Sequence, residues 1–198
     1  MWDKIIIAYV QEVFHSVPLI CAILPDSSLY AGMIVLPIAL LNLYLYSKMV
    51  SKKIPSLRVL AETALIASIP LFSFLLNLII KNVVQRQRPP YEFQQFIHPI
   101  SYSFVSSHSL VTFSLYGFVI FLVLKYCKNV ALKITLVTIS ALWIITVGWS
   151  RIFLGVHYPS DVLSAYLLGF IILLIYIKIH KKLIKELTYE KCTGNSEL

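Results

Sequence analysis

Charged residues are scarce in this chain. They make up 13% of its 198 residues, whereas hydrophobic residues make up 59%, and the mean hydropathy is +0.82. Soluble domains carry about 25% charged residues, so the composition argues against a soluble globular fold and excludes an intrinsically disordered chain. Five segments of 16 to 21 residues contain no Asp, Glu, Lys or Arg, and a helix of about 20 residues crosses a bilayer. The sequence therefore predicts an all-α integral membrane protein.

Charged residues also mark the borders of the five predicted spans. The spans lie between Asp26 and Lys48, between Glu62 and Lys81, from about Phe104 to Lys125, from Lys133 to Arg151, and from Asp161 to Lys178. Helices are expected because backbone hydrogen bonds in lipid must close within the segment. We therefore expect one membrane domain, 1–198, with an N-terminal helix over 1–25, a helical bundle over 26–178 and a basic tail over 179–198.

The first 25 residues follow a different pattern. Apolar side chains recur there at helical spacing, at Trp2, Ile6, Tyr9, Val13 and Val17, while Lys4, Gln11 and His15 gather on another side. Such an amphipathic helix favours the membrane interface. The alternative is a sixth span from Ile5 to Leu24, which would carry Gln11, Glu12 and His15 into the membrane.

Lysine and arginine are distributed unevenly between the two sides of the membrane. Twelve lie in loop 48–58, loop 125–133 and the C-terminal tail, which the alternation of the spans places on one side. The other five are Lys4, Lys81, Arg86, Arg88 and Arg151. The positive-inside rule makes the richer side cytoplasmic, so the net charge of +8 reflects topology and not a nucleic-acid partner. The three cysteines indicate no disulfide framework.

Three polar clusters lie on the side of the membrane with fewer Lys and Arg residues. The first runs from Lys81 to Pro90. Lys81 and Arg88 are seven residues apart, so a helix continuing to Pro89 would place them on one face. Two cations on one face suit an anion such as phosphate. The simpler interpretation is a pair of cationic anchors at a helix end.

The second cluster is Ser106-Ser107-His108-Ser109, at the start of the third span. A serine there can cap the helix, and the free backbone N–H groups of the first turn can bind an anion. His108 is suited to acid–base chemistry near neutral pH. A plain helix cap with an interfacial histidine is the alternative.

The third cluster runs from Ser150 to Asp161. Pro159 fits the first position of the fifth span, which places Asp161 in its first turn. From there the carboxylate can reach His157, fix the tautomer of the imidazole and leave its other nitrogen free to attack. A purely structural His–Asp pair is the alternative.

The three clusters are expected to meet at one end of the bundle. His108 and Ser150 are separated by enough chain for two antiparallel spans and a short turn, so both fall on the same side. A Lys or Arg deep in a bilayer costs about 2.5–3.5 kcal/mol on insertion scales. Three converging cations therefore require an anion or water beside them.

These residues resemble the three-part signature of the type 2 phosphatidic acid phosphatase superfamily. The first part, Lys-x6-Arg-Pro, matches at Lys81, Arg88 and Pro89, and the third, Ser-Arg-x5-His-x3-Asp, matches at Ser150, Arg151, His157 and Asp161. The second part is Pro-Ser-Gly-His in the family, whereas Val105-Ser106-Ser107-His108 stands here. Ser107 adds a side chain where a glycine would let the backbone approach a phosphate closely.

The resemblance implies a role for each residue. His157 would attack phosphorus and form a phosphohistidine, Asp161 would orient it, and His108 would protonate the leaving oxygen. The phosphate oxygens would be held by Lys81, Arg88, Arg151, Ser106 and the backbone at Ser107. Such a reaction needs no metal or other cofactor, and the sequence shows no carboxylate cluster that would bind a metal.

The function implied is that of a lipid phosphate phosphatase in the bacterial cytoplasmic (inner) membrane, with its site on the extracytoplasmic face. The expected partner is a membrane lipid phosphate: undecaprenyl diphosphate, phosphatidylglycerol phosphate, phosphatidate or the lipid A 1-phosphate. Two alternatives stay open, a lipid-to-lipid phosphotransferase and a non-catalytic lipid-binding membrane protein. The oligomeric state is not readable from the sequence.

Overall fold

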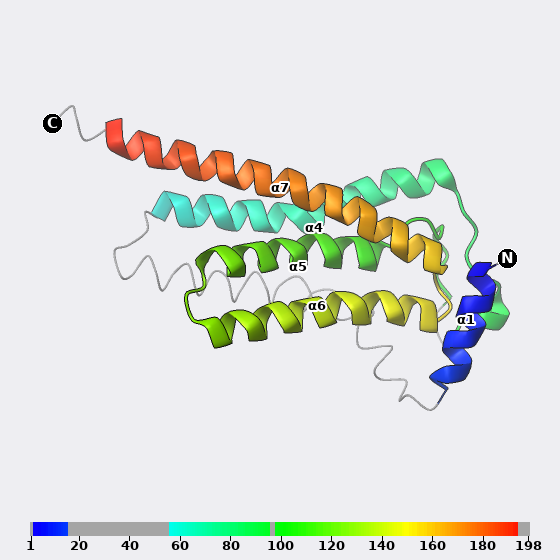
Figure 1. The fold of residues 1–198 in the computed structure, drawn as a ribbon. Helices are drawn as coiled ribbons and strands as arrows, with labels where there is room; N and C mark the ends of the chain where they lie inside the picture. Colours follow the sequence, from blue (N-terminus) through cyan, green and yellow to red (C-terminus); the bar gives the residue numbers. More distant parts are fainter. Residues whose placement is uncertain (1, 16–55, 96–97, 194–198) are drawn as a thin grey trace.

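Helices form most of the described chain (Figure 1). The structure is a computed structural model that describes residues 2–15, 56–95 and 98–193. Its helices are α1 (Trp2–Val13), α4 (Ser56–Val84), α5 (Ser107–Tyr126), α6 (Val130–Phe153) and α7 (Pro159–Thr193), with one turn of 3₁₀-helix, η2 (Tyr91–Phe93). The first predicted span, between Asp26 and Lys48, lies outside these residues.

Four of the helices are long and apolar enough to cross a membrane, namely α4, α5, α6 and α7. They correspond to the second to fifth predicted spans and begin or end a few residues from the predicted borders. The exception is α7, which continues to Thr193 and not only to Lys178. Beyond Lys178 the side chains of Lys181, Lys182, Lys185 and Glu186 are exposed. Lys182 Nζ lies 3.8 Å from Glu186 Oε1 one turn later, so a solvated stretch of helix follows the apolar one without a break.

The outer surface of these four helices is apolar. Large side chains such as Leu71, Ile79, Ile145 and Leu167 are more than half exposed. A soluble protein rarely exposes apolar surface on this scale, whereas lipid accommodates it. The predicted class, an all-α integral membrane protein, is therefore confirmed.

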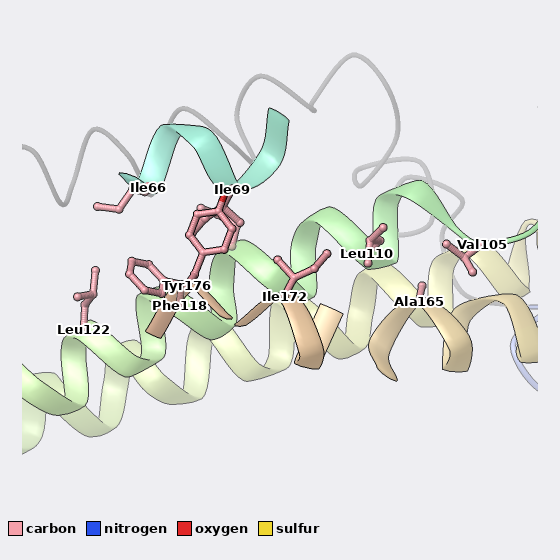
Figure 2. Packing of buried hydrophobic residues seen from close by; sticks show 10 residues of the cluster. Ile66, Ile69, Val105, Leu110, Phe118, Leu122, Ala165, Ile172 and Tyr176 are labelled. Atoms are coloured by element: carbon pink, nitrogen blue, oxygen red, sulfur yellow. The ribbon is translucent and has the colours of Figure 1, made fainter. Parts of the chain in front are cut away.

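Helix α5 is the centre of the bundle and packs against α4, α6 and α7. Its buried face joins Ile66 and Ile69 of α4 to Ala165, Ile172 and Tyr176 of α7, as Figure 2 shows. In water, burying a large apolar side chain stabilises the fold by about 1.5–3 kcal/mol. In a bilayer this hydrophobic contribution is absent between helices, so tight van der Waals packing has to hold them together. The core thereby fixes the ends of α4, α5 and α7 relative to one another.

Helix α1 lies across the end of the bundle at which α5 begins, α6 ends and α7 begins, which we call the α1 end (Figure 1). It packs on α6 and α7. Its 12 residues span about 18 Å at 1.5 Å per residue, too short for the hydrocarbon core of about 30 Å. The predicted N-terminal helix is confirmed over Trp2–Val13. The rest of the predicted segment 1–25, and most of the alternative span from Ile5 to Leu24, lies outside the described residues.

Helix α1 turns most of its predicted apolar face away from the protein. The apolar side chains of Trp2, Ile6, Tyr9 and Val13 are exposed. The inward face carries Asp3, Ile7 and Gln11, and the Gln11 amide donates to the carbonyls of Phe93 (2.8 Å) and Phe153 (2.9 Å). The helix therefore docks through Asp3, Gln11 and the buried Ile7, and leaves a second apolar side outward, as suits a helix at a membrane surface.

Between α6 and α7 the chain turns through Gly155. Its φ is +64°, in the left-handed region that glycine adopts without strain. A Cβ at this position would overlap the carbonyl group of Phe93, which belongs to backbone and cannot rotate away. The next residues, Val156 and His157, both donate their N–H groups to the Arg151 carbonyl (3.2 and 3.3 Å). The turn thus places His157 against the end of α6.

Replacing Gly155 with alanine is expected to destabilise the protein. Left-handed backbone and a clash with fixed backbone together cost about 2–4 kcal/mol, and His157 would move with the turn. Thermal unfolding of the purified protein measures the loss of stability. Ile100→Ala, which shortens a fully exposed side chain, is the control. An unchanged melting temperature in Gly155→Ala would show that the turn tolerates a side chain.

Candidate active site

All eight predicted site residues lie at the α1 end. Lys81 is in the last turn of α4, Ser106 to His108 begin α5, Arg151 is in the last turn of α6, and His157 and Asp161 flank the start of α7. His108 is close enough to Arg151, His157, Lys81 and Arg88 to interact with each of them electrostatically. The structure thus brings together the three clusters that the sequence separates.

His157 is buried and its two ring nitrogens face different partners. Nδ1 lies 3.7 Å from Asp161 Oδ2 and 3.4 Å from the hydroxyl of Ser103. Nε2 lies 3.3 Å from Nη1 of Arg88. One nitrogen is therefore turned toward a carboxylate, and the other toward a cation that would attract a phosphoryl oxygen.

The Asp161 carboxylate is fully buried and held on both oxygens. Oδ2 accepts from Ser103 Oγ at 2.5 Å and from the Tyr158 N–H at 3.0 Å, while Oδ1 accepts from Arg86 Nη1 at 2.5 Å. Since Ser103 contacts both Asp161 and His157, its hydroxyl completes the link between them. Neither Ser103 nor Arg86 was among the predicted site residues, because Ser103 belongs to no motif and Arg86 differs from a surface cation only through its partners.

The environment keeps His157 uncharged. Burial lowers the pKa of His157 from 6.5 to about 3; Asp161 opposes this shift, and the cations of Arg88 and Lys81 add to it. At neutral pH the imidazole is therefore neutral, and the Nε2 lone pair is turned toward Nη1 of Arg88. Protonation of Nε2 would remove the lone pair that a nucleophile needs.

This depressed pKa predicts a pH-dependent stability. Between pH 6.5 and 3 the unfolded chain binds a proton at His157 that the folded protein does not, so the free energy of unfolding falls as the pH is lowered through this window. Above pH 6.5 this contribution is fully present. The slope from one proton is at most about 1.4 kcal/mol per pH unit. Thermal unfolding at several pH values should therefore give a shallower loss in His157→Asn than in the wild type or in His98→Asn, and equal slopes in all three would contradict the shift.

Lys81 and Arg88 meet in a different way from the one predicted. Helix α4 ends at Val84, and Gln85 has a φ of +49°, which terminates the helix while its N–H still bonds to the Lys81 carbonyl. The expectation of one helix reaching Pro89 is wrong. The two cations instead share Ser101, whose Oγ accepts from Lys81 Nζ (3.4 Å) and from Arg88 Nη2 (3.0 Å).

The Arg88 guanidinium is further fixed by backbone carbonyls. Nε donates to the Ser101 carbonyl and Nη1 to the Val156 carbonyl, both at 2.6 Å. Burial lowers the pKa of Arg88 to about 10, with Asp161 opposing and Arg151 adding to the shift, so the side chain stays charged at neutral pH. Its position beside His157 is set by two segments of the chain, at Ser101 and at Val156.

Arg151 is the largest fully buried side chain of the described residues. Its Nε donates to Ser150 Oγ at 3.2 Å, and its charge acts on both Arg88 and His108. A buried guanidinium of this kind is costly without an anion. The cations whose charge acts on His157 itself are Arg88 and Lys81, and Arg151 lies behind them beside Arg88 and His108.

The divergent second motif is held by α4. Val105 is buried in the core, and its carbonyl accepts from Asn77 Nδ2 at 3.0 Å. The Ser107 hydroxyl donates to Asn77 Oδ1 at 2.9 Å, so the side chain that replaces the family's glycine points to α4. Ser106 caps α5, since its Oγ accepts from the Ser109 N–H (3.5 Å) and lies 2.9 Å from the Ser109 hydroxyl.

Asn77 could have been found from the sequence. It is an amide within a largely apolar span, one turn before Lys81, and polar groups in membrane helices usually face the protein interior.

Within residues 2–15, 56–95 and 98–193, no group of three or more His, Cys, Asp or Glu side chains is placed to hold a metal ion.

Comparisons with known proteins agree on one group. The sequence profile of the PAP2 superfamily matches residues 61–185. Phosphatidylglycerophosphatase B of Bacillus subtilis is 34% identical over 99 residues, which are 50% of this chain and 48% of that protein, so the match spans about half of this relative. The fold also resembles a crystal structure of a transmembrane PAP2-type phosphatidylglycerolphosphate phosphatase from Bacillus subtilis, with a TM-score of 0.64, 24% identity, and coverage of 88% of this chain and 78% of that one.

Proposed function

Because the chain belongs to the PAP2 superfamily, we propose that it is a membrane lipid phosphatase that works at the α1 end of the bundle through a phosphohistidine intermediate. The observation that carries this proposal is the orientation of His157. Its Nδ1 is backed by Ser103 and Asp161, and its Nε2 faces the Arg88 guanidinium. A nucleophile needs one nitrogen fixed and the other open to the substrate.

In the first step the Nε2 lone pair of His157 attacks phosphorus. The bond from phosphorus to the lipid oxygen breaks, and His108 gives its proton to that oxygen. Asp161, with the Ser103 hydroxyl, stabilises the positive charge that develops on the imidazole. In the second step water attacks the phosphohistidine, the P–N bond breaks, and the water proton passes to His108, which restores both histidines and releases inorganic phosphate. General acid–base help of this kind contributes about 10²–10⁴-fold.

The cations hold the phosphoryl group. Lys81, Arg88 and Arg151 act on the oxygens that gain charge as the reaction proceeds, and fixed cations in a buried site stabilise such charge strongly. The backbone N–H groups at Ser107 and His108 add donors at the start of α5. The Ser106 hydroxyl acts as the cap that positions this turn, in keeping with its contacts to Ser109.

Phosphatidylglycerol phosphate is the first substrate to test, because the relative that matches half of this chain is named as a phosphatidylglycerophosphatase. Undecaprenyl diphosphate, phosphatidate and lipid A 1-phosphate carry the same reacting group and complete the panel. The distribution of Lys and Arg supports an extracytoplasmic site, since twelve of the 17 basic residues belong to the predicted cytoplasmic side.

The test is phosphate release from each lipid of this panel by the purified full-length protein. We expect release from at least one lipid, unchanged by a metal chelator and absent in His157→Ala. Adding a second lipid as acceptor distinguishes hydrolysis from phosphotransfer, since transfer would lower free phosphate and label the acceptor. Binding of the lipids without any release would overturn the proposal in favour of a non-catalytic role.

A further inference from the structure

Arg86 connects the candidate catalytic pair to the N-terminal helix. Its Nη1 donates to Asp161 Oδ1 at 2.5 Å and to Ser160 Oγ at 2.8 Å, and its Nη2 donates to Asp3 Oδ2 at 2.9 Å. The guanidinium also stacks on the Tyr158 ring, 4.2 Å from its centroid. One planar group thus bridges two carboxylates from distant parts of the sequence.

Both carboxylate oxygens of Asp3 accept hydrogen bonds from this region, from Arg86 or from Ser160. Asp3 is buried although it stands near the start of the chain. Besides binding Arg86, it accepts from the Ser160 N–H (3.1 Å) and from Ser160 Oγ (2.7 Å). Ser160 is the second residue of α7, so the Asp3 carboxylate also interacts with the positive end of the helix dipole of α7.

The position of α1 is determined by residues on one face. Asp3, Ile7 and Gln11 are spaced by four and lie on one side of the helix. Ile7 is fully buried between the two polar contacts, and Gln11 fixes the far end of the helix to Phe93 and Phe153. The helix therefore holds the Asp3 carboxylate in place and does not merely allow it to reach Arg86.

We propose that Asp3 and Arg86 are positioning residues of the active site, and that docking of α1 sets the orientation of the Asp161 carboxylate behind His157. The inference rests on the proposed phosphatase function. Arg86 is one-third exposed, so without Asp3 its guanidinium can turn toward water. Asp161 would then lose the partner of Oδ1 and rotate away from Ser103 and His157. Neither Asp3 nor Arg86 touches the phosphate in this scheme, so the effect is on the chemical step and not on substrate binding.

The test compares kcat and KM of variants on the panel lipid that the wild type hydrolyses fastest. Asp3→Asn keeps the shape and removes the charge. We expect its kcat to fall about 10-fold and that of Arg86→Gln about 10²-fold, as misplaced catalytic groups do, with KM near the wild-type value. Asp3→Glu restores the charge and should recover most of the loss. Glu12→Gln removes an exposed acid from the same helix and should leave kcat unchanged.

A double variant and a folding control complete the test. If Asp3 and Arg86 act through one bridge, Asp3→Asn combined with Arg86→Gln should be no slower than Arg86→Gln alone. All rates are taken per monodisperse molecule, with the melting temperature measured alongside, because a merely structural role would change the amount of folded protein but not its kcat. If Asp3→Asn is not monodisperse, Arg86→Gln carries the test, with kcat still expected to fall about 10²-fold at a KM near the wild-type value, and a wild-type kcat in Arg86→Gln would overturn the inference.

The outcomes separate the two proposals. A wild-type kcat in Asp3→Asn, multiplied losses in the double variant, or an Asp3→Glu variant as slow as Asp3→Asn would each overturn this inference while His157→Asn remains inactive. A wild-type protein that releases no phosphate from any panel lipid would instead count against the proposed function.

Discussion

Replacing His157 with asparagine is expected to reduce phosphate release by at least about 10³-fold, the scale on which removal of a catalytic nucleophile acts. Asparagine is close to the imidazole in size and polarity, so the turn after α6 and its bonds to the Arg151 carbonyl should persist. It has no lone pair that can attack phosphorus, and no covalent intermediate can form. The loss should therefore appear in kcat, while the melting temperature at neutral pH changes little.

The proposed phosphohistidine offers a second measurement. With lipid labelled on the terminal phosphate, rapid quenching into alkali should trap radioactivity on the wild-type protein, since a phosphohistidine survives base and is lost in acid. The label should be absent in His157→Asn. His15→Asn removes an exposed histidine of the N-terminal segment and is the matched control. Label on the His157→Asn protein, or rates above one-tenth of the wild type, would assign the nucleophile elsewhere.

The second large effect is expected for Arg88→Lys. The substitution keeps the positive charge but loses the planar fork that binds the Val156 carbonyl, the Ser101 carbonyl and the Ser101 hydroxyl together. An ammonium on a flexible stem cannot satisfy these directions and also stand 3.3 Å from His157 Nε2. We expect kcat/KM to fall about 10²–10³-fold, the range seen when one fixed donor to a developing oxyanion is lost.

Whether the loss in kcat/KM appears in kcat or in KM tests this explanation. Because Arg88 lies beside the nitrogen proposed to attack, its interaction should strengthen as negative charge builds on the phosphoryl oxygens, so most of the loss should be in kcat. Lys128→Arg, an exchange at an exposed residue between α5 and α6, is the control and should behave like the wild type. A variant that loses only affinity for the lipid would show that Arg88 serves binding and not the reaction.

The parts of the site that were predictable from the sequence depend on local chemistry. Pro159 begins α7 and Asp161 lies in its first turn, where the helix start favours both, and four-residue spacing brings Asp161 toward His157. The same holds for Ser106 as the cap of α5. These features need only the geometry of one helix end, so spacing was sufficient to predict them.

The parts that were missed or wrong depend on contacts between distant segments. The sequence gives no sign that Gln85 ends α4 early, because a left-handed residue other than glycine is stabilised by its surroundings. Ser103 and Asp3 carry no motif and are recognised only by what they touch in three dimensions. The amphipathic pattern located α1 correctly, but periodicity alone does not say which face turns toward the protein.

The length of helix α7 determines how far the candidate site lies from the exposed lysines across the membrane. The helix carries Asp161 near its start and exposed lysines at 181, 182 and 185 further along one unbroken helix. The 20 residues from Asp161 to Lys181 correspond to about 30 Å, which is about the thickness of the hydrocarbon core. When the lysines lie at one membrane surface, the carboxylate is therefore held at the other, at the level of the lipid head groups. A lipid phosphate would then meet the site without its acyl chains leaving the bilayer.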